Sequence, residues 1–202
     1  IRRQRQMCIR DRFVIVFNIS ACGTITKTNV ITNPATDTTY ATAMPEINES
    51  AIIPENSTFA VHFIDVGQGD AALVLCDGKS MLIDGGRPKA SDVIYTYLKN
   101  QGINCLDYII CTHPDEDHIG GLSAPLSTIT VNNVYAPNIE ADTKSYQSFK
   151  QKTEEQGLII KHPVCGESFQ FGSGTVNFFG PVTESENDKN NSSIVMKIIY
   201  GE

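Results

Sequence analysis

The chain has 202 residues, of which 41% are hydrophobic and 19% are charged, and it carries a formal net charge of −7. This length and this hydrophobic share predict one globular domain with a sizeable core, together with segments outside that core. The acidic balance argues against a protein that binds nucleic acid over a broad basic surface.

The first 22 residues differ in character from the rest of the chain. Residues 1–12 contain five Arg and one Asp and resemble translated adaptor sequence, so they are set apart from the fold. The apolar run that follows is too short to span a bilayer, and it ends in Ile-Ser-Ala-Cys, which resembles the lipobox of a bacterial lipoprotein signal. We interpret residues 13–22 as the remnant of such a signal, with Cys22 as the lipid acceptor. The alternative is a buried strand followed by an incidental cysteine.

Residues 23–57 form a threonine-rich segment with few large apolar side chains. Such a composition buries too little surface to offset the entropy lost on ordering, so we predict a disordered linker. With the lipid acceptor, it predicts an extracellular protein that is lipid-anchored to the bacterial cell membrane. The membrane is then one partner, and the sequence gives no sign of a protein partner. Residues 58–202 are expected to be the folded domain.

Apolar alternation and turn signals divide the folded domain into strands and helices. One helix is expected over residues 91–100 with Ser91 as its N-cap, and a second is expected to end near Gln156 after a cap at Asp142 or Thr143. The strands are expected at residues 58–66, 71–76, 79–84, 106–111, 131–136, 158–161, 167–171 and 175–179.

The stretch Thr112–Gly121, T-H-P-D-E-D-H-I-G-G, follows a short apolar strand directly. In an extended chain, residues two apart point the same way, which places His113, Asp115 and Asp117 on one side. His118 joins them from the next turn, and Asp117 is expected to be the N-cap of a following helix. The loop therefore directs two imidazoles and two carboxylates into one small volume.

These carboxylates repel one another, and no Lys or Arg occurs between Asn100 and Thr143 to offset them. A bound cation is the economical remedy, because carboxylate and neutral imidazole are natural metal ligands. The alternative is a solvated acidic turn with two incidental histidines. The spacing favours a metal site, and the expected ligands are His113, Asp115, Asp117 and His118.

Three further polar residues are candidates for the same site. Asp84 ends a strand just before two glycines, where its carboxylate is placed either to orient a ligating histidine or to stabilise the turn. Asp70 and Gln68 lie in an earlier turn, and they either face the site or stabilise that turn. His62 and His162 are not expected to be ligands.

The loop at 112–121 resembles the metal-binding signature of the metallo-β-lactamase superfamily, H-x-H-x-D-H. Here Asp115 replaces the second histidine, as in the DNA-internalisation competence proteins and the phosphorylcholine esterases. Three further stretches resemble motifs of the competence-related subgroup: F-I-D-V-G-Q-G-D at 63–70, M-L-I-D-G-G at 81–86 and N-N-S-S-I-V at 190–195.

The resemblance implies an α/β (α+β) fold, namely the N-terminal part of a metallo-β-lactamase-like αββα sandwich. Members of the family continue with a T-G-D segment and a later G-H-H segment that supply further ligands. We therefore expect the chain to be truncated at the C-terminus, and the fragment itself to be weak or inactive.

The resemblance also implies a metal-dependent hydrolase that acts on a phosphodiester through a metal-bound hydroxide. The cofactors would be two divalent ions, zinc first, with manganese or iron as alternatives because carboxylates harden the site. Asp117 is also assigned to catalysis. The phosphodiester would belong to nucleic acid or to a cell-envelope polymer. The alternatives are a non-catalytic lipoprotein binding module that retains the fold, and a β-lactamase-like amide or ester hydrolase.

Overall fold

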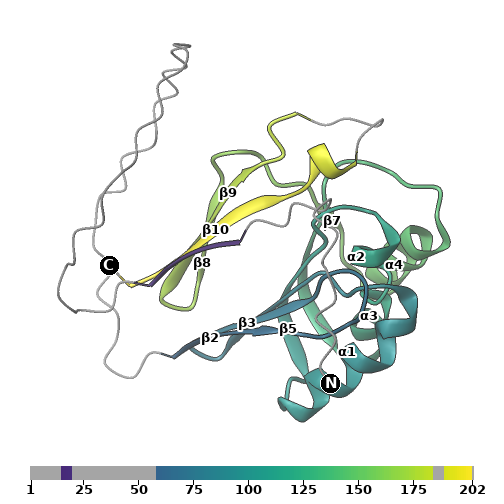
Figure 1. Cartoon of the computed structure of the whole chain (residues 1–202), viewed down its shortest axis with the longest axis horizontal. Helices are drawn as coiled ribbons and strands as arrows, with labels where there is room; N and C mark the ends of the chain where they lie inside the picture. The colour runs from purple at the N-terminus through teal and green to yellow at the C-terminus, as the bar shows by residue number, and fades with distance from the viewer. Residues whose placement is uncertain (1–14, 20–57, 184–188, 202) are drawn as a thin grey trace, which may run out of the picture.

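The computed structural model describes residues 15–19, 58–183 and 189–201, which build two sheets and a layer of helices (Figure 1). The larger sheet has six strands in the order β2-β3-β4-β5-β6-β7, and the smaller has four in the order β1-β10-β9-β8. The larger sheet lies between the smaller sheet and the helices. This layering confirms the expected α/β fold.

The strands of the larger sheet are β2 (Phe59–Phe63), β3 (Ala72–Cys76), β4 (Lys79–Ile83), β5 (Cys105–Ile110), β6 (Thr130–Tyr135) and β7 (Ile160–Lys161). Those of the smaller sheet are β1 (Ile15–Ile19), β8 (Ser168–Phe171), β9 (Gly174–Gly180) and β10 (Val195–Tyr200). The helices are α1 (Ser91–Asn100), α2 (Glu116–Ile119), α3 (Ser123–Thr128) and α4 (Lys144–Glu155), with short 3-10 turns η1 (Pro88–Ala90) and η2 (Asn190–Ser192).

The larger sheet is buried on both faces, and side-chain alternation assigns its residues to two cores. On β3, Val74 points toward the smaller sheet, whereas its neighbour Leu73 points toward the helices. On β4, Met81 and Leu82 divide in the same way. Each of these four side chains is fully buried, and such burial contributes about 1.5–3 kcal/mol per side chain.

Strands β4 to β7 run parallel, whereas β2, β3 and β4 form an antiparallel meander. Parallel strands need crossover connections, and α1 and α4 provide two of them. The carboxyl ends of β4 and β5 therefore meet at the same edge of the sheet. Binding sites of open α/β sheets commonly form at such an edge.

The helix ends differ in part from the expected ones. Helix α1 spans the predicted residues, but its N-cap is Ala90, and Ser91 is its first residue, with Oγ donating to the Pro88 carbonyl at 2.7 Å. The prediction of Ser91 as N-cap is therefore wrong, because η1 already turns the chain before the helix. The cap of α4 at Thr143 is confirmed, since its Oγ1 accepts from the backbone N–H of Tyr146.

Residues 15–19 form β1, which pairs in parallel with β10. This strand corresponds to the alternative interpretation of residues 13–22, in which the apolar run is a strand and not a signal. The predictions for residues 1–12, for Cys22 and for the linker 23–57 concern residues outside the described part and stay predictions. Among the described helices, none has the length and hydropathy that a bilayer crossing requires.

Candidate metal centre

The loop of the expected ligands begins where β5 ends, between β4 and β6. Backbone hydrogen bonds continue the sheet there: Asp84 N–H donates to the Ile110 carbonyl at 2.9 Å, and Cys111 N–H donates to the Tyr135 carbonyl at 2.8 Å. These bonds fix the start of the loop on the rigid sheet. We call residues 111–118 the metal loop.

The metal loop turns directly into α2, and Asp115 is the N-cap of that helix. Its backbone carbonyl accepts from the N–H groups of His118 and Ile119, both at 3.0 Å, while its carboxylate makes no capping bond. The prediction of Asp117 as N-cap is therefore wrong, because the helix begins at Glu116. Asp117 lies in the first turn of α2 instead.

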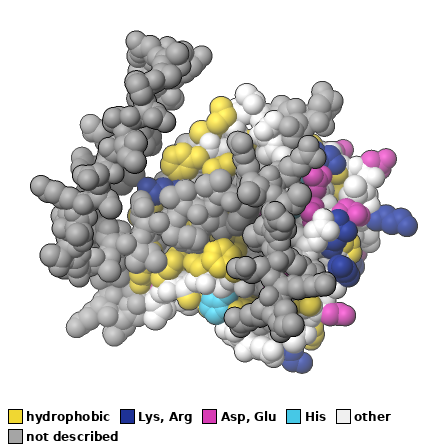
Figure 2. Space-filling view, in the orientation of Figure 1, with side chains coloured by type: hydrophobic (Ala, Val, Ile, Leu, Met, Phe, Trp, Pro, Cys, Tyr) yellow, Lys and Arg dark blue, Asp and Glu magenta, His cyan; other side chains and the backbone are white. Residues whose placement is uncertain are grey.

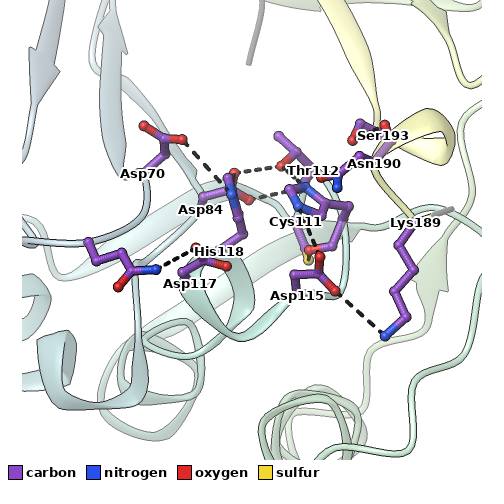
Figure 3. Close-up of polar contacts among 12 residues, drawn as sticks. Asp70, Asp84, Cys111, Thr112, Asp115, Asp117, His118, Lys189, Asn190 and Ser193 are labelled. Carbon is purple, nitrogen blue, oxygen red and sulfur yellow. Dashed lines mark hydrogen bonds and ion pairs between the residues drawn. The ribbon is translucent and has the colours of Figure 1, made fainter. Parts of the chain in front are cut away.

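Asp84 organises the interior of the site (Figure 3). It is fully buried, and its backbone lies in the left-handed region at φ 56°. Its carboxylate accepts from Thr112 N–H at 2.8 Å, from Thr112 Oγ1 at 2.6 Å and from His118 Nδ1 at 2.8 Å. A non-glycine residue in this region costs on the order of 1 kcal/mol, and it persists only where its surroundings fix it. The expected contact of Asp84 with a histidine is thus present.

The hydrogen bonds around Thr112 set the tautomers of both histidines. The Thr112 hydroxyl has one proton, which it donates to Asp84, so it accepts from His113 Nδ1 at 3.1 Å. His118 Nδ1 donates to Asp84. Both neutral imidazoles then carry their proton on Nδ1 and have a lone pair on Nε2, the form in which imidazole binds a metal.

His118 lies in a strongly negative environment. Burial alone would lower its pKa, but the hydrogen bond and charge of Asp84, with the charges of Asp70 and Asp117, outweigh burial and raise the pKa to about 9. The side chain is 1% exposed, and its Nε2 forms no hydrogen bond with any residue that the structure describes. This position favours a cation, either a proton or a metal ion.

His113 and Asp115 form a second pair of donor atoms beside His118. His113 Nε2 lies 3.8 Å from Asp115 Oδ2, and the ring centroids of His113 and His118 are 3.9 Å apart. Lys189, which immediately precedes η2, places its Nζ 3.5 Å from Asp115 Oδ1. Figure 3 shows Lys189 and Asp70 on opposite sides of His118.

The turn between β2 and β3 closes the site from the other side. Asp70 N–H donates to the Asp117 carbonyl at 3.3 Å, and Gln68 Nε2 lies 3.5 Å from Asp117 Oδ2. A side chain at Gly69 would overlap the Asp117 carbonyl, so this approach requires glycine. Asp70 Oδ2 lies 4.0 Å from His118 Nε2.

The donor set fits a divalent ion, although it is not closed around one. In the described residues, no three His, Cys, Asp or Glu side chains are already arranged about a single ion position. Two ligand atoms of a tetrahedral zinc ion lie about 3.3 Å apart, whereas the two pairs here are 3.8 and 4.0 Å apart. Small side-chain rotations would close each pair, and the buried Nε2 of His118 supplies a donor with no other bond in the described part.

The structure brings the expected residues together and adds two. From the sequence, Asp70 either faces the site or stabilises its turn. Lys189 has no sequence signal beyond its position next to Asn190. The two histidines not expected as ligands lie elsewhere: His62 Nδ1 contacts Tyr97 OH at 2.7 Å, and His162 Nδ1 contacts the Ala136 carbonyl at 3.0 Å.

Known proteins resemble the chain in sequence. It is 27% identical over 154 residues to ComE operon protein 3 of Bacillus subtilis (strain 168), covering 67% of this chain and 20% of that protein. It is 27% identical over 150 residues to competence protein ComA of Neisseria gonorrhoeae, covering 74% of this chain and 19% of that protein. Recombination protein 2 of Haemophilus influenzae is 37% identical over 97 residues, 46% of this chain and 11% of that protein. The chain thus spans a fifth or less of each of these relatives.

The family assignment rests on the sequence match. Among solved structures, metallo-β-lactamase SMB-1 bound to 2-mercaptoethanesulfonate is 22% identical, with a TM-score of 0.45 over 59% of this chain and 49% of that chain. The family model described as the metallo-beta-lactamase superfamily matches residues 64–190, which include β3 to β9 and the metal loop. The chain therefore belongs to the metallo-beta-lactamase superfamily.

Proposed function

We propose that the protein is a metal-dependent hydrolase that cleaves a phosphodiester, with His113, Asp115, Asp117 and His118 as metal ligands. One observation carries the proposal: the buried Nε2 of His118 lies among carboxylates and has no hydrogen-bond partner in the described part of the chain. A metal ion satisfies that nitrogen and offsets the surrounding negative charge. A solvated acidic turn, the alternative from sequence, does not account for a histidine that is 1% exposed.

The residues of the site have separate roles: some orient the metal ligands, and others bind the ion or act in catalysis. Asp84 orients His118, and through Thr112 it fixes the tautomer of His113, so both lone pairs face the site before an ion arrives. Asp117, on the first turn of α2, is the carboxylate that we assign to both ligation and catalysis. A divalent ion held by these residues would lower the pKa of bound water toward 7 and so would supply a nucleophile at neutral pH. The two imidazoles favour zinc, and the carboxylates make manganese or iron the alternatives.

The substrate class rests on the replacement of an imidazole by Asp115 and on the relatives. A carboxylate at this position resembles the competence and phosphorylcholine-esterase subgroups and weakens the case for a β-lactam. One matched relative is named a competence protein and another a recombination protein, which supports a nucleic-acid phosphodiester. In Figure 2, acidic and basic side chains intermingle on the helical side, with no continuous basic patch among the described residues in view. The formal net charge of −7 argues against a broad basic surface, so we expect any nucleic acid to be bound locally at the site.

The test is hydrolysis of a chromogenic phosphodiester, a phosphomonoester and a β-lactam by metal-loaded protein. We expect turnover to be weak and to prefer the phosphodiester. His118→Ala should lower that turnover at least about 100-fold, since even residues that only contact the ligands of a metal site contribute about 10–100-fold. His162→Ala is the matched control, because His162 is an exposed histidine away from the site.

Two results would contradict the proposal. Stoichiometric metal binding without hydrolysis of any of the three substrates would favour the non-catalytic binding module. A preference for the β-lactam that is lost in His118→Ala would favour the amide hydrolase.

A further inference from the structure

Two backbone hydrogen bonds of Asp70 hold this residue next to the metal loop. Its own carbonyl accepts from Gly86 N–H at 2.9 Å, in the loop that follows Asp84, and its N–H donates to the Asp117 carbonyl at 3.3 Å. Asp70 is thus fixed between the ends of β4 and β5, although it comes from a turn more than 40 residues before the metal loop. Neither hydrogen bond uses its side chain.

The side chain of Asp70 faces a donor atom of the site. Its Oδ2 lies 4.0 Å from Nε2 of His118, on the side of the ring opposite Asp115 (Figure 3). In the neutral form, in which His118 donates its Nδ1 proton to Asp84, its Nε2 presents a lone pair to this carboxylate. A lone pair and a carboxylate repel unless a cation lies between them.

The side-chain cap of the turn comes from another carboxylate. Asp65 provides that cap, since its Oδ1 accepts from Gly67 N–H at 3.0 Å. The close approach of Gly69 to the Asp117 carbonyl instead brings the next residue toward the metal loop. The geometry of the turn is thus suited to delivering a side chain to the site.

We propose that Asp70 is a metal ligand, and that it shares one divalent ion with His118 and Asp117. His113 and Asp115 then belong to a neighbouring ion position, as expected for a site of two ions about 3.5–4 Å apart. This inference rests on the proposed function, and it adds a ligand from outside the H-x-D-x-D-H stretch. Its consequence is a site richer in oxygen donors than that stretch alone provides, which favours a harder ion.

The experiment compares Asp70→Asn with Asp65→Asn, a matched change in the same turn. Zinc and manganese affinities are measured by competition with a chelator, and thermal unfolding is followed with and without metal. For Asp70→Asn we expect at least about a tenfold loss of affinity for one ion. We also expect a smaller rise in Tm when metal is added. Asp65→Asn should bind both metals like the unaltered protein.

The outcomes separate this inference from the proposed function. If the unaltered protein binds no divalent ion, both fail. If it binds metal and Asp70→Asn binds it equally well, only the role of Asp70 is overturned. A lower Tm of Asp70→Asn without metal, together with an unchanged metal affinity, would make Asp70 a turn residue.

Discussion

Residues of the site that lie close together in the sequence could be predicted from their spacing. The alternation of an extended chain grouped His113, Asp115 and Asp117, and the following turn added His118. The place of Asp84 at a strand end left two roles open, orienting a histidine or stabilising the turn. Lys189 was not predictable, because its contact with Asp115 joins residues 74 positions apart. The caps at Ser91 and Asp117 were wrong because in each case the chain had already begun to turn at an earlier residue.

The charge environment of His118 predicts a pH dependence of stability in the metal-free protein. Its pKa is raised from 6.5 to about 9 in the folded state, so the folded state holds a proton that the unfolded state releases. The resulting stabilisation is fully present below pH 6.5 and is lost as the pH rises toward 9. It is worth at most about 3.5 kcal/mol, since one pKa unit corresponds to about 1.4 kcal/mol.

This dependence is measured as the free energy of unfolding of chelator-treated protein at pH 6 and pH 9. The unaltered protein should be less stable at pH 9, whereas His118→Gln should lose most of the difference. An equal fall with pH in both proteins would assign the effect to other groups.

At the scale of elements, the predicted helices and most strands are present, because periodicity and caps are local signals. Helix α1 matches its predicted residues, and α4 begins at its predicted cap, Thr143. Helix α3 was not predicted, since its six residues are too few to show a helical period and include Pro125. The docking of η2 on the metal loop depends on tertiary contacts, such as Ile194 N–H donating to the Thr112 carbonyl at 2.8 Å.

The docking of η2 predicts that Lys189 competes with a metal ion for Asp115. Replacing Lys189 with Met should tighten metal binding about two- to fivefold, because a partly exposed ion pair is worth less than about 1 kcal/mol. The matched control is Lys152→Met, since the Lys152 side chain is 31% exposed like that of Lys189 but pairs with Glu155 on α4. Both variants are compared by chelator competition at low ionic strength. Weaker binding in Lys189→Met would show that the lysine supports the ion rather than competing with it.

At the scale of the molecule, the two sheets and the helical layer place the metal loop at an edge where several strands end. The larger sheet is rigid there because both of its faces are covered. The apolar pattern predicted most of the strands, and the resemblance of the motifs implied the sandwich architecture. The distance between the two atoms of each donor pair depends on packing and could not be predicted. The chain belongs to the metallo-beta-lactamase superfamily, and the proposed metal site rests on the donor atoms that the fold brings together at this edge.

The central claim is that the metal loop binds divalent ions through its two imidazoles. The most direct measurement is X-ray absorption spectroscopy of the zinc-loaded protein, together with the number of ions retained per chain after dialysis. We predict stoichiometric zinc with imidazole nitrogens about 2.0–2.1 Å away, and its loss in the His113→Ala, His118→Ala double variant. No retained ion in the unaltered protein, or equal retention by the double variant, would contradict the account.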